Sequence, residues 1–194
     1  MRPLALLCLL SGLGGCAALQ PSAIAPAALQ RDQLQTFALT GRFSLRQEDK
    51  STIGRLNWRH AEASDELLLS SPLGQGMAEI VSDASGARLT GSDGDTHSAE
   101  NVDQLLQSVL GYALPLRQLT DWVRGRNPDG GLLTVDALGR PLRLRHAAWR
   151  IDYEYDSDDP QALPGRLFVE RDSVFELRLR IEQWLPLPAE SAAR

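Results

Sequence analysis

WRIDYEY, residues Trp149 to Tyr155, is the stretch that decides the fold class. Apolar and aromatic side chains occupy every second position, and charged side chains occupy the positions between them. Successive side chains of a β-strand point to opposite faces, so this alternation predicts a strand with one dry face and one wet face. Strands of this kind are typical of antiparallel sheets, which can leave one face in water.

The same period of two recurs along most of the chain. The apolar positions of the clearest strands are Leu39, Phe43, Leu45, Leu56, Trp58, Leu142, Leu144, Leu177, Leu179 and Ile181. Clusters of turn-forming residues separate the strands at 83–86, 91–95, 127–131, 139–141 and 156–160. We therefore predict a mainly β protein with about eleven antiparallel strands and no internal repeat.

One segment, AENVDQLLQSVLGYALPLRQLTDWVRG at 99–125, breaks the strand pattern. Its first part lies between a suitable N-cap, Asn101, and a stop, Gly111, and has an apolar stripe at helical spacing. The stripe consists of Val102, Leu105, Leu106, Val109 and Leu110. Pro115 can open a second short helix that continues through Trp122. The spacing of Leu29, Gln33 and Phe37 predicts a further short helix before the first strand.

An antiparallel sheet of this length, with one apolar face, must curl on itself or be covered. The simplest arrangement is a curved sheet that approaches a barrel, with the helices lying over its mouth. The interior of such a barrel can be filled by side chains or left open for a ligand, and the alternation is compatible with both. The length of the chain suits one folded domain.

The sequence contains no motif for covalent chemistry. It has no GxSxG elbow, no Walker loop and no dinucleotide fingerprint. The histidines at 60, 97 and 146 have no partner at a metal-site spacing, so we interpret them as structural or solvated. The Asp158–Asp159 pair and GSDGDT at 91–96 are typical of turns, not of an acid–base pair or a calcium loop. We therefore expect no enzyme, no metal site and no cofactor.

The N-terminus has the layout of a secretory signal. Arg2 gives it a positive end, Leu4 to Leu10 form an apolar run too short to span a bilayer, and small residues lead to Cys16. LGGC at the end of this stretch resembles the bacterial lipobox, in which the cysteine becomes the lipidated first residue. An ordinary signal, cleaved near residue 17 or 18 and leaving no lipid, is the alternative.

The residue after the cysteine is Ala17. In lipoproteins of this type an aspartate there favours retention in the inner membrane, so the resemblance implies the outer membrane. Cys8 leaves with the signal, and no thiol then remains for a disulfide. Nineteen basic residues face twenty-five acidic ones after cleavage, a net charge near −6 that argues against a nucleic-acid partner.

We divide the chain into a signal peptide at 1–15, a lipidated N-terminus and flexible tether at 16–26, a single folded domain at 27–186 and a tail at 187–194. The tether is small, uncharged and Pro-containing, which suits a flexible connection.

Several phrases, in this order, resemble the LolB family of outer-membrane lipoproteins, which receive other lipoproteins and insert them into that membrane. They span about Phe37 to Trp184 and are GRFSL (41–45), LNW (56–58), LLLSSPLGQ (67–75), ALPLRQLTDWVRG (113–125), WRIDYEY (149–155), LP (163–164) and LRLRIEQW (177–184).

The resemblance implies a half-open antiparallel barrel with a helical lid around a hydrophobic cavity for acyl chains. It also implies a monomer on the periplasmic face of the outer membrane, held by lipid on Cys16, that takes cargo from the periplasmic carrier LolA. Without a nucleotide site, transfer must run downhill in affinity from carrier to receptor to phospholipid bilayer. The alternatives are a soluble LolA-like carrier or other lipid chaperone, a structural lipoprotein with a solid core, and a lipid hydrolase.

Strand alternation gives the candidates for the cavity lining, which are Phe43, Leu56, Trp58, Trp149, Ile151, Tyr153, Leu177 and Leu179. In the family, a protruding loop with an apolar residue drives membrane insertion, and the matching position here is Leu73. Turn chemistry agrees, because Ser71, Pro72 and Gly74 fit a type I turn with Leu73 facing outward at its third position. The turn alone favours the interpretation of Leu73 as one of the single exposed apolar residues found on any surface, and the family resemblance at this position reverses that preference.

Overall fold

The structure is a computed structural model, and it describes residue 31 and residues 34–111, 114–172 and 174–187. Its main element is one antiparallel sheet of eleven strands, in agreement with the prediction. The strands are β1 (Phe37–Gln47), β2 (Lys50–Ala61), β3 (Ser64–Ser70), β4 (Gly76–Asp83), β5 (Gly86–Gly91), β6 (Thr96–Ala99), β7 (Leu132–Val135), β8 (Pro141–His146), β9 (Trp149–Glu154), β10 (Arg166–Arg171) and β11 (Phe175–Pro186).

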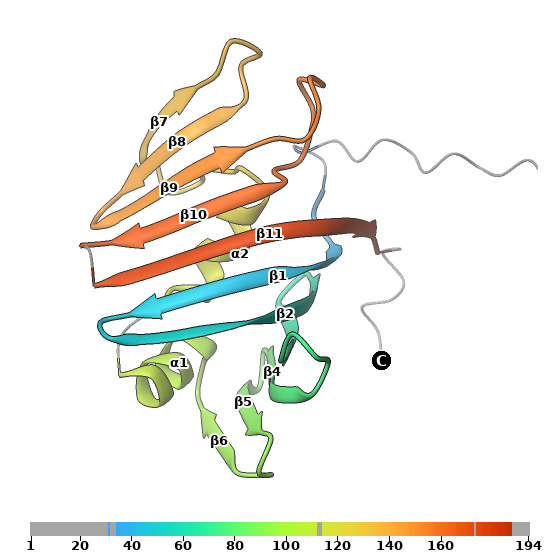
Figure 1. Ribbon diagram of the computed structural model, residues 1–194, viewed down its shortest axis with the longest axis vertical. Helices are drawn as coiled ribbons and strands as arrows, with labels where there is room; N and C mark the ends of the chain where they lie inside the picture. The colour runs from blue at the N-terminus through green and yellow to red at the C-terminus, as the bar shows by residue number, and fades with distance from the viewer. Residues whose placement is uncertain (1–30, 32–33, 112–113, 173, 188–194) are drawn as a thin grey trace, which may run out of the picture.

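The first and last strands lie side by side in the middle of the sheet. β1 pairs with β2 on one side and with β11 on the other, so the order across the sheet is β6-β5-β4-β3-β2-β1-β11-β10-β9-β8-β7. The two outermost strands, β6 and β7, do not pair with each other. The sheet therefore curls around its concave face without closing, which is the half-open barrel that the family resemblance implies (Figure 1).

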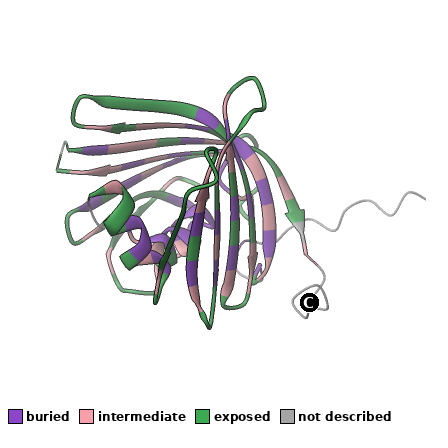
Figure 2. Ribbon diagram, turned by 90° about the horizontal axis from the view of Figure 1, so that it is seen from below, coloured by how far each residue is buried: buried purple, intermediate pink, exposed green. Residues whose placement is uncertain are grey.

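Two helices lie in the hollow of the curled sheet, as Figure 2 shows from below. They are α1 (Val102–Leu110) and α2 (Leu116–Val123), and we call them the helical lid. α1 begins and ends as predicted: the side chain of Asn101 accepts a hydrogen bond from the N–H of Gln104, and Gly111 ends the helix in the left-handed conformation. α2 begins directly after Pro115.

The dry face of the sheet is its concave face. In β9 the side chains of Trp149, Ile151 and Tyr153 are buried there, and the charged residues between them face outward. The opposite, convex face carries cross-strand ion pairs, for example Arg46 with Glu176 at 2.6 Å. The alternation in the sequence thus separates an apolar interior from a charged exterior.

Two sequence predictions about single residues are wrong. Phe37 does not belong to a helix but begins β1, where it pairs with His60 of β2 and with Pro186 of β11. Its ring is fully buried between Trp58 and Trp184, at centroid distances of 5.5 and 5.4 Å. This packing outweighs the helical spacing, and residues 34–36 are not helical either. Residues 29 and 33 lie outside the described residues.

Leu142 is half exposed, although the alternation placed it beside the buried Leu144 on the dry face. The pairing of β7 with β8 shifts register here, since Thr134 lies opposite Arg143 and Val135 lies opposite Pro141. Leu142 is the residue skipped by this bulge, so its side chain leaves the alternation of the dry face.

Candidate functional site

The β3–β4 hairpin holds Leu73 in water. The N–H of Gly74 donates to the carbonyl of Ser71 at 2.9 Å, and the N–H of Ser71 donates to the carbonyl of Gln75 at 2.7 Å. Leu73 has a negative φ, whereas Gly74 has φ = 87°, which together fit a type I turn followed by a left-handed residue. The side chain of Leu73 is 91% exposed. The outward projection predicted from the turn residues is therefore present.

The stretch around this tip contains no charge. From Leu67 to Ala78 every residue is apolar or neutral, and the nearest charged residues along the chain are Glu66 and Glu79. The hydroxyl of Ser71 accepts a further hydrogen bond from the N–H of Gln75, at 3.2 Å. The tip of the hairpin thus presents the side chain of Leu73 on an uncharged, internally hydrogen-bonded support.

The eight residues predicted to line a cavity all lie in strands of the sheet, and seven of them are buried. Leu177 is the exception, being partly buried against the core. They belong to one cluster with apolar side chains of both helices, including Leu105 of α1 and Trp122 of α2. The indole of Trp122 lies 5.7 Å from that of Trp149. The helical lid therefore packs directly on the concave face.

Polar contacts hold the helical lid at three places. The carboxylate of Asp103 in α1 accepts from the N–H of Leu116 at 2.9 Å, which joins the two helices at the start of α2. Gln47, at the end of β1, donates to the last carbonyl of α1, that of Leu110, at 3.1 Å. The third contact is made by Arg124, directly after α2.

Arg124 is 4% exposed and ties α2 to the chain that leads into β1. Its guanidinium donates to the carbonyl of Leu34 at 2.8 Å and to the carboxylate of Asp121 at 2.7 Å, and it lies over the ring of Phe37. Burial, followed by the charge of Arg126, lowers the pKa of Arg124. A buried cation of this kind needs all of its hydrogen bonds, so it fixes the position of the end of α2.

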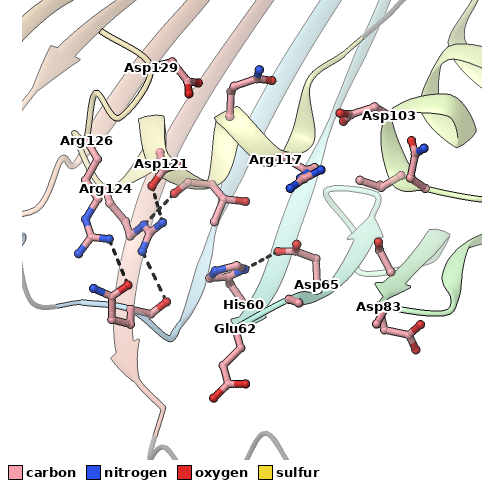
Figure 3. A pocket seen from close by; sticks show the side chains of 18 residues that line it. His60, Glu62, Asp65, Asp83, Asp103, Arg117, Asp121, Arg124, Arg126 and Asp129 are labelled. Carbon is pink, nitrogen blue, oxygen red and sulfur yellow. Dashed lines mark hydrogen bonds and ion pairs between the residues drawn. The ribbon is translucent and has the colours of Figure 1, made fainter.

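A pocket of about 930 Å³ opens between the helical lid and the ends of β2, β3 and β4 (Figure 3). It is lined mainly by polar side chains and by none of the eight predicted residues. Six carboxylates, of Glu62, Asp65, Asp83, Asp103, Asp121 and Asp129, outnumber three guanidiniums, of Arg117, Arg124 and Arg126. A lining of this kind does not suit an acyl chain, so the predicted hydrophobic lining stays a prediction for the eight residues of the concave face.

His60 and Asp65 form a polar cluster at the inner wall of this pocket. One carboxylate oxygen of Asp65 accepts from the indole N–H of Trp58 at 2.8 Å and lies 2.9 Å from Nδ1 of His60. The cluster fixes the ring of Trp58 on the concave face. His60 therefore has structural contacts, in agreement with the interpretation of the histidines as structural or solvated.

Within the described residues, no group of three or more His, Cys, Asp or Glu side chains could hold a metal ion. No helix in that part of the chain has the length and apolar character needed to cross a membrane. The predicted signal, the lipidation site Cys16 and the tether lie outside the described residues, so they stay predictions.

A family model described as outer membrane lipoprotein LolB matches residues 35–184. The chain belongs to the LolB family. The resemblance drawn from the sequence phrases is thereby confirmed. Curated relatives include the outer-membrane lipoprotein LolB of Dechloromonas aromatica, which is 40% identical over 188 residues that cover 94% of this chain and 97% of the relative. The LolB of Thiobacillus denitrificans is 37% identical over 193 residues, covering 97% and 100%.

The fold of this LolB family member also occurs in solved structures of distant sequence. A LolA superfamily protein from Nitrosomonas europaea superposes with a TM-score of 0.52 at 11% identity, covering 84% of this chain and 91% of that chain. A DUF1329 family protein from Desulfovibrio piger gives a TM-score of 0.53 at 10% identity, covering 84% and 92%. At these identities the likeness concerns the fold alone, and it confirms the curled sheet as a recurrent architecture.

Proposed function

We propose that this LolB family member receives lipoproteins from the periplasmic carrier LolA and inserts them into the outer membrane. It would work from the periplasmic face of that membrane, as a monomer anchored by lipid on Cys16, and without changing a covalent bond. The observation that carries the proposal is the β3–β4 hairpin, which holds Leu73 91% exposed in a chain of this family.

Leu73 is suited to touch lipid without anchoring the protein. Full burial of a leucine side chain in hydrocarbon is worth about 1.5 to 3 kcal/mol, which favours contact but is too little for stable attachment. The uncharged stretch from Leu67 to Ala78 lets the tip approach the bilayer without removing a charge from water. Stable attachment would come from the lipid on Cys16.

The concave face is suited to receive acyl chains. Each methylene taken out of water is worth about 0.8 kcal/mol, so a lipoprotein needs a dry surface at every stage of its route. Here the apolar surface is covered by two short helices, and a helical lid that moved away would offer that surface to a ligand. The cargo would then replace the apolar contacts that α1 and α2 make in the present structure.

Transfer without nucleotide requires a sequence of increasing affinities, from LolA to this protein and from this protein to the bilayer. The direct test offers LolA-bound lipoprotein to the purified protein, first alone and then with phospholipid vesicles, in the absence of ATP. We expect cargo to pass to the protein in the first step and to the vesicles in the second. Cargo that stays on LolA in the first step would contradict the proposal.

The anchor on Cys16 distinguishes this receptor from a soluble carrier of the same fold. We expect radiolabelled palmitate to be incorporated into the protein in cells and to be absent from the Cys16→Ala variant. A wild-type protein that carried no label and stayed in the soluble periplasmic fraction would favour the carrier instead.

A further inference from the structure

The hydroxyl of Tyr153 is a hydrogen-bond donor without an acceptor. Tyr153 is 3% exposed, and its hydroxyl has no partner among the described residues. Tyr155, two residues later and just past the end of β9, behaves differently, because its hydroxyl donates to the carbonyl of Pro141 at 2.8 Å. Buried hydroxyls are nearly always hydrogen-bonded, so Tyr153 needs an explanation beyond packing.

Contacts made by the end of α2 and by a residue just after it flank Tyr153. At one end of β9, Trp149 packs on Trp122 of α2 with the ring centroids 5.7 Å apart. Beyond the other end of β9, Gly125, just after α2, packs on the ring of Pro141, whose carbonyl is the partner of Tyr155. Along the chain, Tyr153 lies between Trp149 and Tyr155, the two residues that these contacts involve. It is buried on the concave face, in the cluster that also contains Trp122 of α2.

The chemistry of the position selects a neutral acceptor. Burial, and to a smaller extent Tyr155, raises the pKa of Tyr153, so the hydroxyl stays protonated and can donate. A phenylalanine would fill the same space without leaving a polar atom unpaired. A carboxylate or phosphate would have to lose its hydration to enter this dry interior, whereas an ester or amide carbonyl can enter at much lower cost.

An apolar surface adjoins this position at the rim of the sheet. Val135, Leu138 and Leu142, in the hairpin of β7 and β8, are all at least two-fifths exposed. Leu142 follows Pro141, whose carbonyl accepts the hydrogen bond of Tyr155, two residues beyond Tyr153. An acyl chain that slid under α2 from this rim would meet apolar side chains first and the hydroxyl of Tyr153 afterwards.

We propose that Tyr153 is a ligand-binding residue that donates a hydrogen bond to the ester or amide carbonyl at the head of an acyl chain of a bound lipoprotein. The inference rests on the proposed function, because it requires acyl chains to enter between α2 and the concave face. It adds that the site recognises the carbonyl of an acyl chain and not only its hydrocarbon.

The test uses two probes that differ only in that carbonyl: 1-palmitoyl-lysophosphatidylcholine, an ester, and 1-O-hexadecyl-lysophosphatidylcholine, an ether. Binding to the full mature chain is measured by tryptophan fluorescence below the micellar concentration. We expect the wild type to prefer the ester about tenfold, and Tyr153→Phe to lose the preference by weakening ester binding alone. The matched control Tyr155→Phe should keep the preference, since the hydroxyl of Tyr155 already has a partner.

Three results would overturn the assignment: equal binding of the two probes by the wild type, a preference that persists in Tyr153→Phe, or a melting temperature of Tyr153→Phe well below that of the wild type. The last result would show that the hydroxyl is already satisfied in the free protein. If neither probe bound the wild type, the acyl-binding function itself would fail, and this outcome is distinct from the other three.

A competition experiment separates the two natural sources of such a carbonyl. A triacylated cysteine lipopeptide represents the cargo, and dipalmitoyl-phosphatidylethanolamine represents the bilayer. We expect the lipopeptide to displace the ester probe at the lower concentration. The reverse order would assign the site to membrane phospholipid and contradict the assignment to cargo.

Discussion

The concave face of the sheet and the tip of the β3–β4 hairpin both carry apolar side chains, but only the first is covered. Trp58, Ile151 and Leu179 are buried under the helical lid, whereas Leu73 stands 91% exposed. The difference lies in the backbone around them. A strand face can be covered by helices, while a five-residue loop closed by its own hydrogen bonds holds its middle residue away from the fold. We infer that the concave face receives the lipid of the cargo and that Leu73 acts in its delivery to the membrane.

The largest effect is expected from breaking the covered surface. Trp58→Ala removes a fully buried indole and the partner of Asp65, and we expect it to lower the free energy of unfolding by about 3 to 5 kcal/mol. Leu73→Ala should change it by less than about 0.5 kcal/mol, because the side chain has no packing to lose. Urea denaturation of both variants measures the contrast. Similar losses in the two variants would mean that Leu73 is part of the core.

A smaller effect is expected from releasing the helical lid. Arg124→Met keeps the aliphatic stem but leaves the carbonyl of Leu34 without its donor, and we expect a loss of about 2 kcal/mol. The loss should appear as faster hydrogen exchange in α2 than in the central strands β1 and β11. Arg126→Met, two residues away and less buried, is the matched control. Uniform acceleration across the sheet would show that Arg124 does not act on the helical lid in particular.

The rigidity of the β3–β4 hairpin tip can be tested at Gly74, which has φ = 87° and open space around its Cα. Gly74→Ala forces a side chain into the left-handed region, and we expect a cost of about 1 kcal/mol together with a looser tip. Gly76→Ala is the control, because Gly76 also faces open space but has no positive φ. Chemical denaturation and exchange of the Ser71 and Gly74 amides give the readout. Equal costs at both positions would contradict the turn geometry.

The smallest effect is expected on the convex face, where the ion pairs are exposed to solvent. The hydrogen bond from Arg46, assisted by Arg178, lowers the pKa of Glu176 below its usual value of 4.5. The ionised Glu176 carboxylate therefore stabilises the folded protein above that pH, and this stabilisation disappears as the pH falls through the lowered pKa. Because Arg46 is largely exposed, we expect Glu176→Gln to cost at most about 0.5 kcal/mol at pH 7, and nothing at pH 2. If the stability cost of Glu176→Gln grew as the pH fell, the expected pH dependence would be contradicted.

Much of the fold could be predicted because local signals agree with the tertiary structure. The period of two gives the strands, and the Asn101 cap and the Gly111 stop give α1 its observed ends. The position of Leu73 follows from the neighbouring turn residues. Phe37 and Leu142 could not be predicted, because pairing with two strands decides the first and a bulge at the rim decides the second.

The site was harder to predict than the fold because its parts come from distant elements. The polar pocket joins residues of the β2–β3 turn, β4 and α1 that no spacing connects, among them Glu62, Asp83 and Asp103. The N–H of Leu116 is satisfied by Asp103, thirteen residues earlier, and not by a local cap. Alternation places Tyr153 on the inner face but says nothing about whether its hydroxyl finds a partner. Such contacts depend on how the curled sheet brings its ends together.

The most direct test of the central claim is the two-step transfer assay with Leu73→Glu. We expect this variant to accept cargo from LolA as the wild type does, but to insert less than about a tenth of it into vesicles, since the loss of 1.5 to 3 kcal/mol of burial corresponds to at least a tenfold effect. Leu132→Glu, at an exposed leucine on the edge strand β7, should insert normally. Normal insertion by Leu73→Glu, or its failure to accept cargo, would contradict the assignment of reception and delivery to separate surfaces.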